Sequence, residues 1–167
     1  DGFSQGLYYA AYGTSNVTAF SVDTEVKYAG TSSMKFAVPD TGHPNGSYAG
    51  GGFGANPPRD LSGYNVLTFW AKSSQATVIN EAGFGSDMGA NRYQVTLRNI
   101  SLNTNWKQFF IPVPNPSLLT QERGMFFYAA SPQNGHGYTF WIDEVKFENL
   151  GTLAHPGYGI FNGLDIV

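Results

Sequence analysis

Apolar and polar residues alternate over short stretches of this chain, with the period of a β-strand rather than that of a helix. In Val66–Lys72, every second residue from Leu67 to Ala71 is apolar, and the residues between them include Trp70. Successive side chains of a strand point to opposite faces. The segment therefore predicts a strand with one core face and a second face that carries Trp70 beside Lys72.

Turn residues separate such segments throughout the chain, which holds 21 Gly and nine Pro. Dipeptides such as Asn45-Gly46 and Asn134-Gly135 tolerate the positive φ that tight turns require. No long stretch shows a helical apolar stripe. The predicted strands are Asn16–Val22, Ser33–Val38, Ser47–Phe53, Val66–Lys72, Val78–Gly85, Tyr93–Leu97, Lys107–Val113, Gly124–Ala130 and Tyr138–Phe147.

About nine strands with almost no helix predict an all-β fold, a β-sandwich of the jelly-roll type. A chain of 167 residues has the size of one domain. The alternation is lost near Leu150, so we expect the domain to cover residues 1–150. Residues 151–167 are expected to form a C-terminal connector or an outer strand. Because the chain begins at Asp1, we expect it to be a mature or excised fragment of a longer protein.

The amino-acid composition excludes several classes of function. Charged residues make up 13% of the chain, about half the usual share, and aromatic residues make up 16%. The net charge is −3 and the nine Lys and Arg are scattered, so no basic stripe is available to bind nucleic acid. No run of about 18 apolar residues is present to insert into a membrane. The chain has no Cys, which excludes disulfides and thiolate chemistry. Such a Tyr-rich, weakly charged surface favours neutral polar ligands.

Trp70 and Lys72 are the first candidate ligand-binding residues, because a Trp on a polar sheet face can stack on the apolar C–H face of a pyranose. The alternative is that Trp70 lies beneath a loop as part of a small secondary core. Tyr128, on one face with Phe126, is a further candidate that could equally belong to the core.

A second candidate set lies in the strand that follows Tyr93. There Gln94, Thr96 and Arg98 share one face, and an amide, a hydroxyl and a guanidinium can make paired hydrogen bonds to vicinal hydroxyls. An ordinary solvated face is the alternative. The run Gly50-Gly51-Gly52 is unusual for a strand, because glycine leaves nothing to pack, and would let a chain-like ligand approach the backbone.

Catalytic signatures are missing. The three His are far apart and have no zinc-binding spacing, and there is neither a nucleophile elbow nor a phosphate-binding loop. A jelly roll can still carry a glycosidase or a lyase if two carboxyl groups face each other across a cleft. The sequence pairs none of its candidates, which are Asp40, Asp60, Glu81, Asp87 and the Asp143-Glu144 pair.

Four segments resemble jelly-roll carbohydrate-binding modules of families 4, 11 and 22, which share a galactose-binding-like sandwich. They are Tyr28-Ala29-Gly30-Thr31-Ser32-Ser33-Met34-Lys35, Asp60-Leu61-Ser62-Gly63-Tyr64 with Leu67-Thr68-Phe69-Trp70-Ala71-Lys72, Asn105-Trp106-Lys107-Gln108-Phe109-Phe110-Ile111-Pro112 and Phe140-Trp141-Ile142-Asp143-Glu144-Val145. The resemblance covers about residues 1–150. It implies a non-catalytic module that is tethered to other domains of a larger secreted or cell-surface protein. In such modules, the strands matching Val66–Lys72 and Tyr93–Arg98 bear sugar-binding residues. This implicates Trp70, Arg98 and Tyr93, although alternation places Tyr93 opposite Arg98 unless a bulge lies between them.

The resemblance also implies a structural Ca²⁺ far from the sugar site. Carried over, the ligands are the Asp143 carboxylate and backbone oxygens of Gly2 and Thr31, a mixture that Ca²⁺ tolerates. Relatives often have an acidic residue where Ser4 stands, so Asp23 or Asp1 would have to substitute. The alternative for Asp143 is a side chain that caps a turn.

We therefore predict non-catalytic binding of a polysaccharide, a β-glucan or xylan-type chain, on a concave sheet face. The first alternative is a jelly-roll glycosidase or polysaccharide lyase. The second is an adhesion or spacer domain without a glycan ligand.

Overall fold

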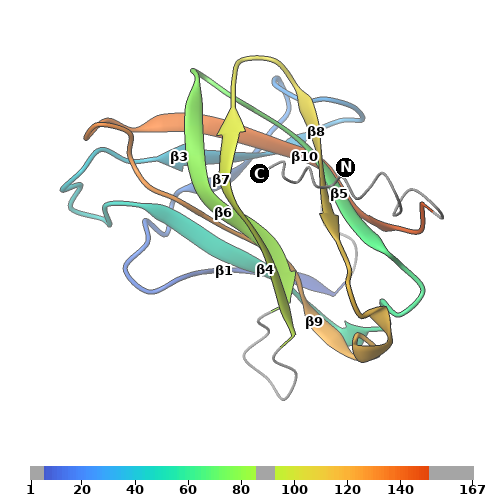
Figure 1. Cartoon of the computed structure of the whole chain (residues 1–167). Helices are drawn as coiled ribbons and strands as arrows, with labels where there is room; N and C mark the ends of the chain where they lie inside the picture. Colours follow the sequence, from blue (N-terminus) through green and yellow to red (C-terminus); the bar gives the residue numbers. More distant parts are fainter. Residues whose placement is uncertain (1–5, 86–92, 151–167) are drawn as a thin grey trace.

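The computed structural model describes residues 6–85 and 93–150, which form ten β-strands and one short 3-10 helix. The strands make two five-stranded antiparallel sheets stacked as a sandwich (Figure 1). Sheet A has the order β1-β4-β9-β6-β7 and sheet B the order β2-β3-β10-β5-β8. The predicted all-β sandwich is confirmed. The predicted connector, residues 151–167, lies outside the described residues. No helix in the described part is long and apolar enough to span a membrane.

The strand bounds are β1 Leu7–Ala11, β2 Phe20–Asp23, β3 Ser33–Val38, β4 Ala49–Arg59, β5 Val66–Ser73, β6 Thr77–Gly85, β7 Gln94–Leu102, β8 Lys107–Pro112, β9 Glu122–Ala130 and β10 Tyr138–Glu148, with the 3-10 helix η1 at Pro116–Leu118 between β8 and β9. Six of the nine predicted strands match these bounds to within two residues, and two more match at their start, although β4 and β7 run six and five residues further than predicted. The ninth, Asn16–Val22, is shorter as β2, because the Asn16 side chain accepts hydrogen bonds from Thr18 and makes a turn instead.

Strand β1 was not predicted. All five of its residues are apolar by type, so polarity does not reveal the alternation, although exposure alternates along the strand. Strand β4 runs further than predicted, through Pro57 and Pro58. These two residues lie where pairing with β9 is interrupted between Gly54 and Arg59, because proline has no N–H to donate to the ladder.

The core between the sheets is largely aromatic. Phe36 of sheet B stacks on Phe140 with ring centroids 4.8 Å apart, and it contacts Tyr128 of sheet A at 4.2 Å. Leu67, Phe69 and Ala71 are fully buried, which confirms the core face predicted for β5. Packing of these rings fixes which face of each strand is turned outward.

Candidate functional site

The outer face of sheet A is continuous across five strands. Residues directly opposite one another in an antiparallel ladder share a face. One such line runs from Ala10 in β1 through Gly52, Phe127 and Gly83 to Thr96 in β7. The neighbours of Phe127 along β9 pack into the core, so this line points away from the core.

Small residues occupy several of the middle positions of this outer face, on either side of Phe127. Besides Gly52 and Gly83 in that line, the outward positions include Gly50 opposite Ala129, with Glu81 as the next partner of Ala129. Gly50, Gly54 and Gly83 are nevertheless buried, because neighbouring side chains cover them. Aromatic side chains form part of this covering layer.

Three tyrosines, here called the tyrosine row, lie against β4: Tyr8, Tyr12 and Tyr48. They lie over the glycines at alternate outward positions, which are Gly50, Gly52 and Gly54. A Cβ added at Gly50 would come 2.9 Å from ring carbon Cε2 of Tyr48. A Cβ at Gly52 would overlap the Tyr12 hydroxyl, and one at Gly54 would overlap the Tyr8 ring. Only glycine leaves room for three rings so close to the strand.

The tyrosine row remains open to solvent. Tyr8 is 49% exposed and Tyr12 36% exposed, and Tyr48 is partly exposed. The Tyr48 hydroxyl donates a 2.9 Å hydrogen bond to the backbone carbonyl oxygen of Tyr12 and ties the Tyr48 ring to the end of β1. Burial raises the pKa of Tyr12, and the neighbouring charges of Tyr9 and Glu81 raise it further. Tyr12 is therefore a protonated phenol at neutral pH and can donate a hydrogen bond.

Polar side chains stand at the opposite edge of the same face. Gln94, Thr96 and Arg98 all point outward from β7, as the alternation predicted, and the Gln94 amide donates a 3.1 Å hydrogen bond to the Thr96 hydroxyl. Arg98 Nε lies 3.6 Å from Glu81 Oε2, and its side chain is 73% exposed. Hydrogen-bonding groups thus flank the aromatic part of the face.

The predicted ligand residues do not form one site. Gln94 and Arg98 lie on the outer face of sheet A, whereas Trp70 and Lys72 point outward from β5 in sheet B, on the other side of the sandwich. The alternation assigned each strand's faces correctly. It could not show that the two strands belong to different sheets.

Two predicted ligand residues belong to the interior. Tyr128 is 0% exposed and its hydroxyl lies 2.9 Å from that of Tyr9, so its prediction as an aromatic platform is wrong. Tyr93 packs against the core beside Phe84, and its hydroxyl accepts the backbone N–H of Asn115. The β6–β7 register is unbroken from Gln94 to Arg98, so no bulge brings Tyr93 to the outer face.

The candidate catalytic carboxylates have other partners. Glu81 pairs with Arg98, Asp40 accepts the N–H of Gly137 at 2.7 Å, and Asp60 accepts two hydrogen bonds from Ser62. Asp87 lies outside the described residues. These contacts give Glu81, Asp40 and Asp60 structural partners within the described residues.

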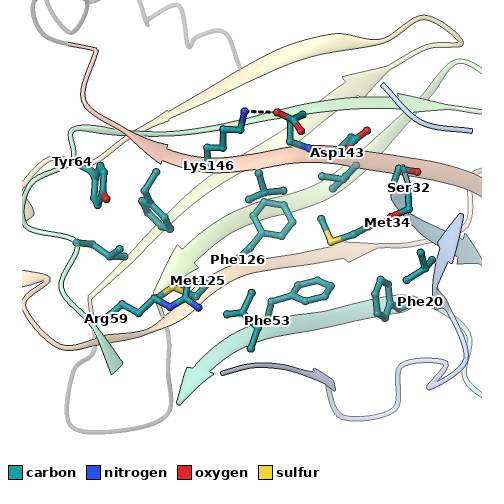
Figure 2. Close-up of a pocket in the computed structure, with 18 of the residues that line it drawn as sticks. Phe20, Ser32, Met34, Phe53, Arg59, Tyr64, Met125, Phe126, Asp143 and Lys146 are labelled. Atoms are coloured by element: carbon teal, nitrogen blue, oxygen red, sulfur yellow. Dashed lines mark hydrogen bonds and ion pairs between the residues drawn. The ribbon is translucent and has the colours of Figure 1, made fainter. Parts of the chain in front are cut away.

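A cavity of about 510 Å³ opens between the two sheets (Figure 2). Core side chains such as Phe20, Met34, Phe53 and Phe126 line it, and Arg59 lies at one end. The cavity lies beside the β10 irregularity between Asp143 and Lys146, where register with β5 shifts. Its lining also includes polar side chains such as Ser32, Asp60 and Lys146.

The two predicted carboxylate ligands of calcium are already occupied. Asp143 accepts backbone N–H groups of Tyr28 at 2.8 Å and Ala29 at 3.1 Å through one oxygen, and that of Glu144 at 2.8 Å through the other. This is the turn-capping alternative, here across two segments.

Asp23 has a similar set of partners. It accepts the indole N–H of Trp141 at 2.9 Å and two backbone N–H groups, and Lys35 Nζ lies 3.5 Å away. The indole N–H first, and then the backbone donors, hold the pKa of Asp23 well below 3.8. The Lys35 ammonium would compete with a cation for this carboxylate.

The rest of the predicted calcium set adds no cluster. Thr31 lies two residues before β3, and Gly2 lies outside the described residues. No group of three or more His, Cys, Asp or Glu that could hold a metal ion occurs among residues 6–85 and 93–150. Calcium binding remains a prediction from the resemblance.

Comparison with solved structures supports the fold. The family 30 carbohydrate-binding module of the cellulosomal cellulase Cel9D-Cel44B of Clostridium thermocellum is 15% identical, with a TM-score of 0.57 over 87% of this chain and 92% of that chain. A family 11 module from Clostridium thermocellum, solved with a β-1,3-1,4-mixed-linked tetrasaccharide, is 16% identical, with a TM-score of 0.53 over 88% and 91%. The K1 cleaved adhesin domain of Lys-gingipain from Porphyromonas gingivalis W83 is 14% identical, with a TM-score of 0.59 over 90% and 95%.

These identities are low enough that the structures show a shared fold alone. No curated protein matches the chain in sequence. The family comparison is decisive: the model of the family described as Carbohydrate binding domain 30 matches residues 3–149. The chain therefore belongs to the Carbohydrate binding domain 30 family and is a non-catalytic carbohydrate-binding module.

Proposed function

We propose that the outer face of sheet A is the carbohydrate-binding site and that it takes a neutral, chain-like polysaccharide of the β-glucan or xylan type. The tyrosine row over the glycines of β4 is the observation that carries this proposal. Exposed phenol rings beside glycines that carry no side chain offer apolar faces, on which the C–H faces of successive pyranoses can stack.

The length of the row favours a chain over a single sugar. Outward positions along a strand are two residues apart, or about 6.6 Å, so the rings over Gly50, Gly52 and Gly54 follow roughly 13 Å of strand. An aromatic surface of that length suits several linked pyranoses. The polar groups of Gln94, Thr96 and Arg98 would then hydrogen-bond to equatorial hydroxyls from the other edge of the face.

The openness of this face also sets the expected affinity for a polysaccharide. An open face keeps most ligand hydroxyls in water, so binding gains stacking and a few hydrogen bonds only. We expect dissociation constants in the micromolar to millimolar range, roughly −4 to −8 kcal/mol.

Affinity gel electrophoresis tests the proposal with three soluble polysaccharides: mixed-linked β-1,3-1,4-glucan, hydroxyethyl cellulose and xylan. At least one polysaccharide is expected to retard the wild-type chain. Tyr8→Ala and Tyr12→Ala are each expected to weaken the affinity measured from this retardation. A ring–pyranose contact worth as much as an aromatic pair corresponds to a loss of about two- to thirteenfold. Both side chains are exposed, so thermal unfolding is expected to change little.

Tyr64→Ala is the matched control. Tyr64 is 38% exposed, close to Tyr12, but it lies between β4 and β5 and packs against Phe147. Its loss is expected to leave retardation unchanged. If Tyr8→Ala and Tyr12→Ala bind every polysaccharide as the wild type does, the face has been assigned wrongly.

We further infer that the module works as part of a larger extracellular protein. Support comes from the structural neighbour whose description places it in a cellulosomal cellulase. Mass spectrometry of the native protein from culture supernatant tests this inference, and recovery of the module only inside cells would contradict it.

A further inference from the structure

A second aromatic surface lies on the opposite side of the sandwich. On the outer face of sheet B, the Tyr28 ring stacks on Trp70 with centroids 3.9 Å apart and planes 12° from parallel. Trp106 meets Tyr28 edge-on at 6.0 Å. We call Tyr28, Trp70 and Trp106 the Tyr28 cluster. Tyr28 is its outermost ring and is 43% exposed.

The Tyr28 ring is held in place from below. The backbone N–H groups of Tyr28 and Ala29 both donate to the same Asp143 oxygen, and Asp143 is only 5% exposed. A carboxylate buried under the loop therefore fixes the backbone that carries the ring. A ligand that stacks on Tyr28 would not have to order it first, and this lowers the cost of binding.

Polar groups surround the cluster. Gln108 stands directly opposite Trp70 in the β5–β8 ladder, so it shares the face. Lys72 lies one outward position further along β5 and places its ammonium 5.8 Å from the centre of the Trp141 ring. An exposed ring beside an amide and an ammonium repeats, on sheet B, the combination that sheet A offers with its tyrosines and its Gln94–Arg98 edge.

We propose that the outer face of sheet B is a second carbohydrate contact, in which the exposed side of Tyr28 stacks on a pyranose while Gln108 and Lys72 bind its hydroxyls. One copy of the module would then contact two polysaccharide chains, one on each side of the sandwich. The inference rests on the proposed function for the class of ligand and on a different surface for the site.

Because of where the tryptophans lie, ligand binding at the outer face of sheet B can be observed separately from binding at sheet A. The chain has three Trp, and Trp70, Trp106 and Trp141 all belong to the outer side of sheet B. The rings proposed to stack on sugar in sheet A are tyrosines. Tryptophan emission, excited selectively, therefore reports on sheet B.

The experiment titrates mixed-linked β-1,3-1,4-glucan into the wild type, a Tyr8→Ala/Tyr12→Ala double variant and Tyr28→Ala, while following tryptophan emission. The double variant is expected to keep a saturable change in emission despite its weakened retardation in gels. In Tyr28→Ala the affinity derived from emission is expected to fall roughly two- to thirteenfold. Tyr28→Phe keeps the ring and is expected to behave as the wild type, with circular dichroism confirming that each variant is folded.

The outcomes separate the two proposals. No change in tryptophan emission in the double variant, or an unaltered titration in Tyr28→Ala, overturns the second contact and leaves the sheet A site standing. Normal retardation of the double variant, combined with a loss in Tyr28→Ala, overturns the sheet A site and supports the contact at Tyr28.

Discussion

Adding one methyl group to the glycines of β4 should separate binding from stability. Gly52 faces outward beneath Tyr12, and its φ is not positive, so alanine can adopt the same backbone. In Gly52→Ala the new Cβ would overlap the Tyr12 hydroxyl, which is the far end of an exposed side chain. The ring can move away at little cost to the fold, but it can no longer lie against the strand.

Gly52→Ala is expected to change the free energy of unfolding and the binding affinity in opposite directions. Alanine in place of a strand glycine stabilises by about 0.5–1 kcal/mol, because the unfolded chain loses freedom. Displacing one ring of the tyrosine row removes a contact worth about 0.5–1.5 kcal/mol, which is a loss of roughly two- to thirteenfold in affinity. We therefore expect Gly52→Ala to bind more weakly while unfolding at the same urea concentration or a higher one.

The neighbouring Gly51 provides a matched control, because it faces the core. A Cβ there would come 2.5 Å from the hydroxyl oxygen of Tyr9 and 2.7 Å from its ring. Tyr9 cannot give way easily, since it lies between Phe20 and Phe53 and is tied to Tyr128 by a 2.9 Å hydrogen bond. Gly51→Ala should lower the free energy of unfolding by about 1–3 kcal/mol and leave the affinity of the folded protein unchanged.

The assays are isothermal calorimetry or affinity gels for binding and urea unfolding for stability, at a temperature where all variants are folded. Wild-type affinity in Gly52→Ala would refute the reasoning that glycine seats the Tyr12 ring for a ligand. An equal loss of affinity in Gly51→Ala would show that any disturbance of β4 suffices and that the outward face has no special role.

Three further outcomes follow from the contacts described above. Asp143→Ala removes the acceptor for the N–H groups of Tyr28 and Ala29 and should lower the free energy of unfolding by about 1–3 kcal/mol in urea titrations; unchanged stability would show that water replaces the carboxylate. Tyr128→Phe removes the buried hydroxyl that pairs with Tyr9 and should cost about 0.5–1.5 kcal/mol at pH 7. Because burial raises the pKa of Tyr128 above its ordinary value of 10, the folded protein should lose stability as the pH rises beyond about 10, and Tyr128→Phe should lose less over that range; parallel alkaline curves would contradict the assignment. If the calcium site that the resemblance implies is present, excess Ca²⁺ over chelator should raise the melting temperature by several degrees, whereas an unchanged melting temperature would leave Asp143 and Asp23 with only the partners described above.

Local pattern alone determined most of the architecture. Strand periodicity is a property of neighbouring residues, so the two-residue repeat around Phe69 was sufficient to predict β5 and its core face. The same repeat placed Gln94 and Arg98 on one side of β7. It failed for β1, where Tyr8 and Ala10 are apolar yet exposed, because their exposure follows from the place of β1 at the edge of sheet A.

Tertiary structure determined which outward faces lie next to one another. Trp70 and Arg98 looked like parts of one site, but strand order depends on pairings between distant segments and puts β5 and β7 in different sheets. The glycines of β4 suggested only an accessible backbone until pairing with β1 brought Tyr8 over Gly54. The alternation of apolar and polar residues shows only whether each side chain points inward or outward. Which outward faces adjoin is set by long-range hydrogen bonding and core packing, and these exist only in the folded chain.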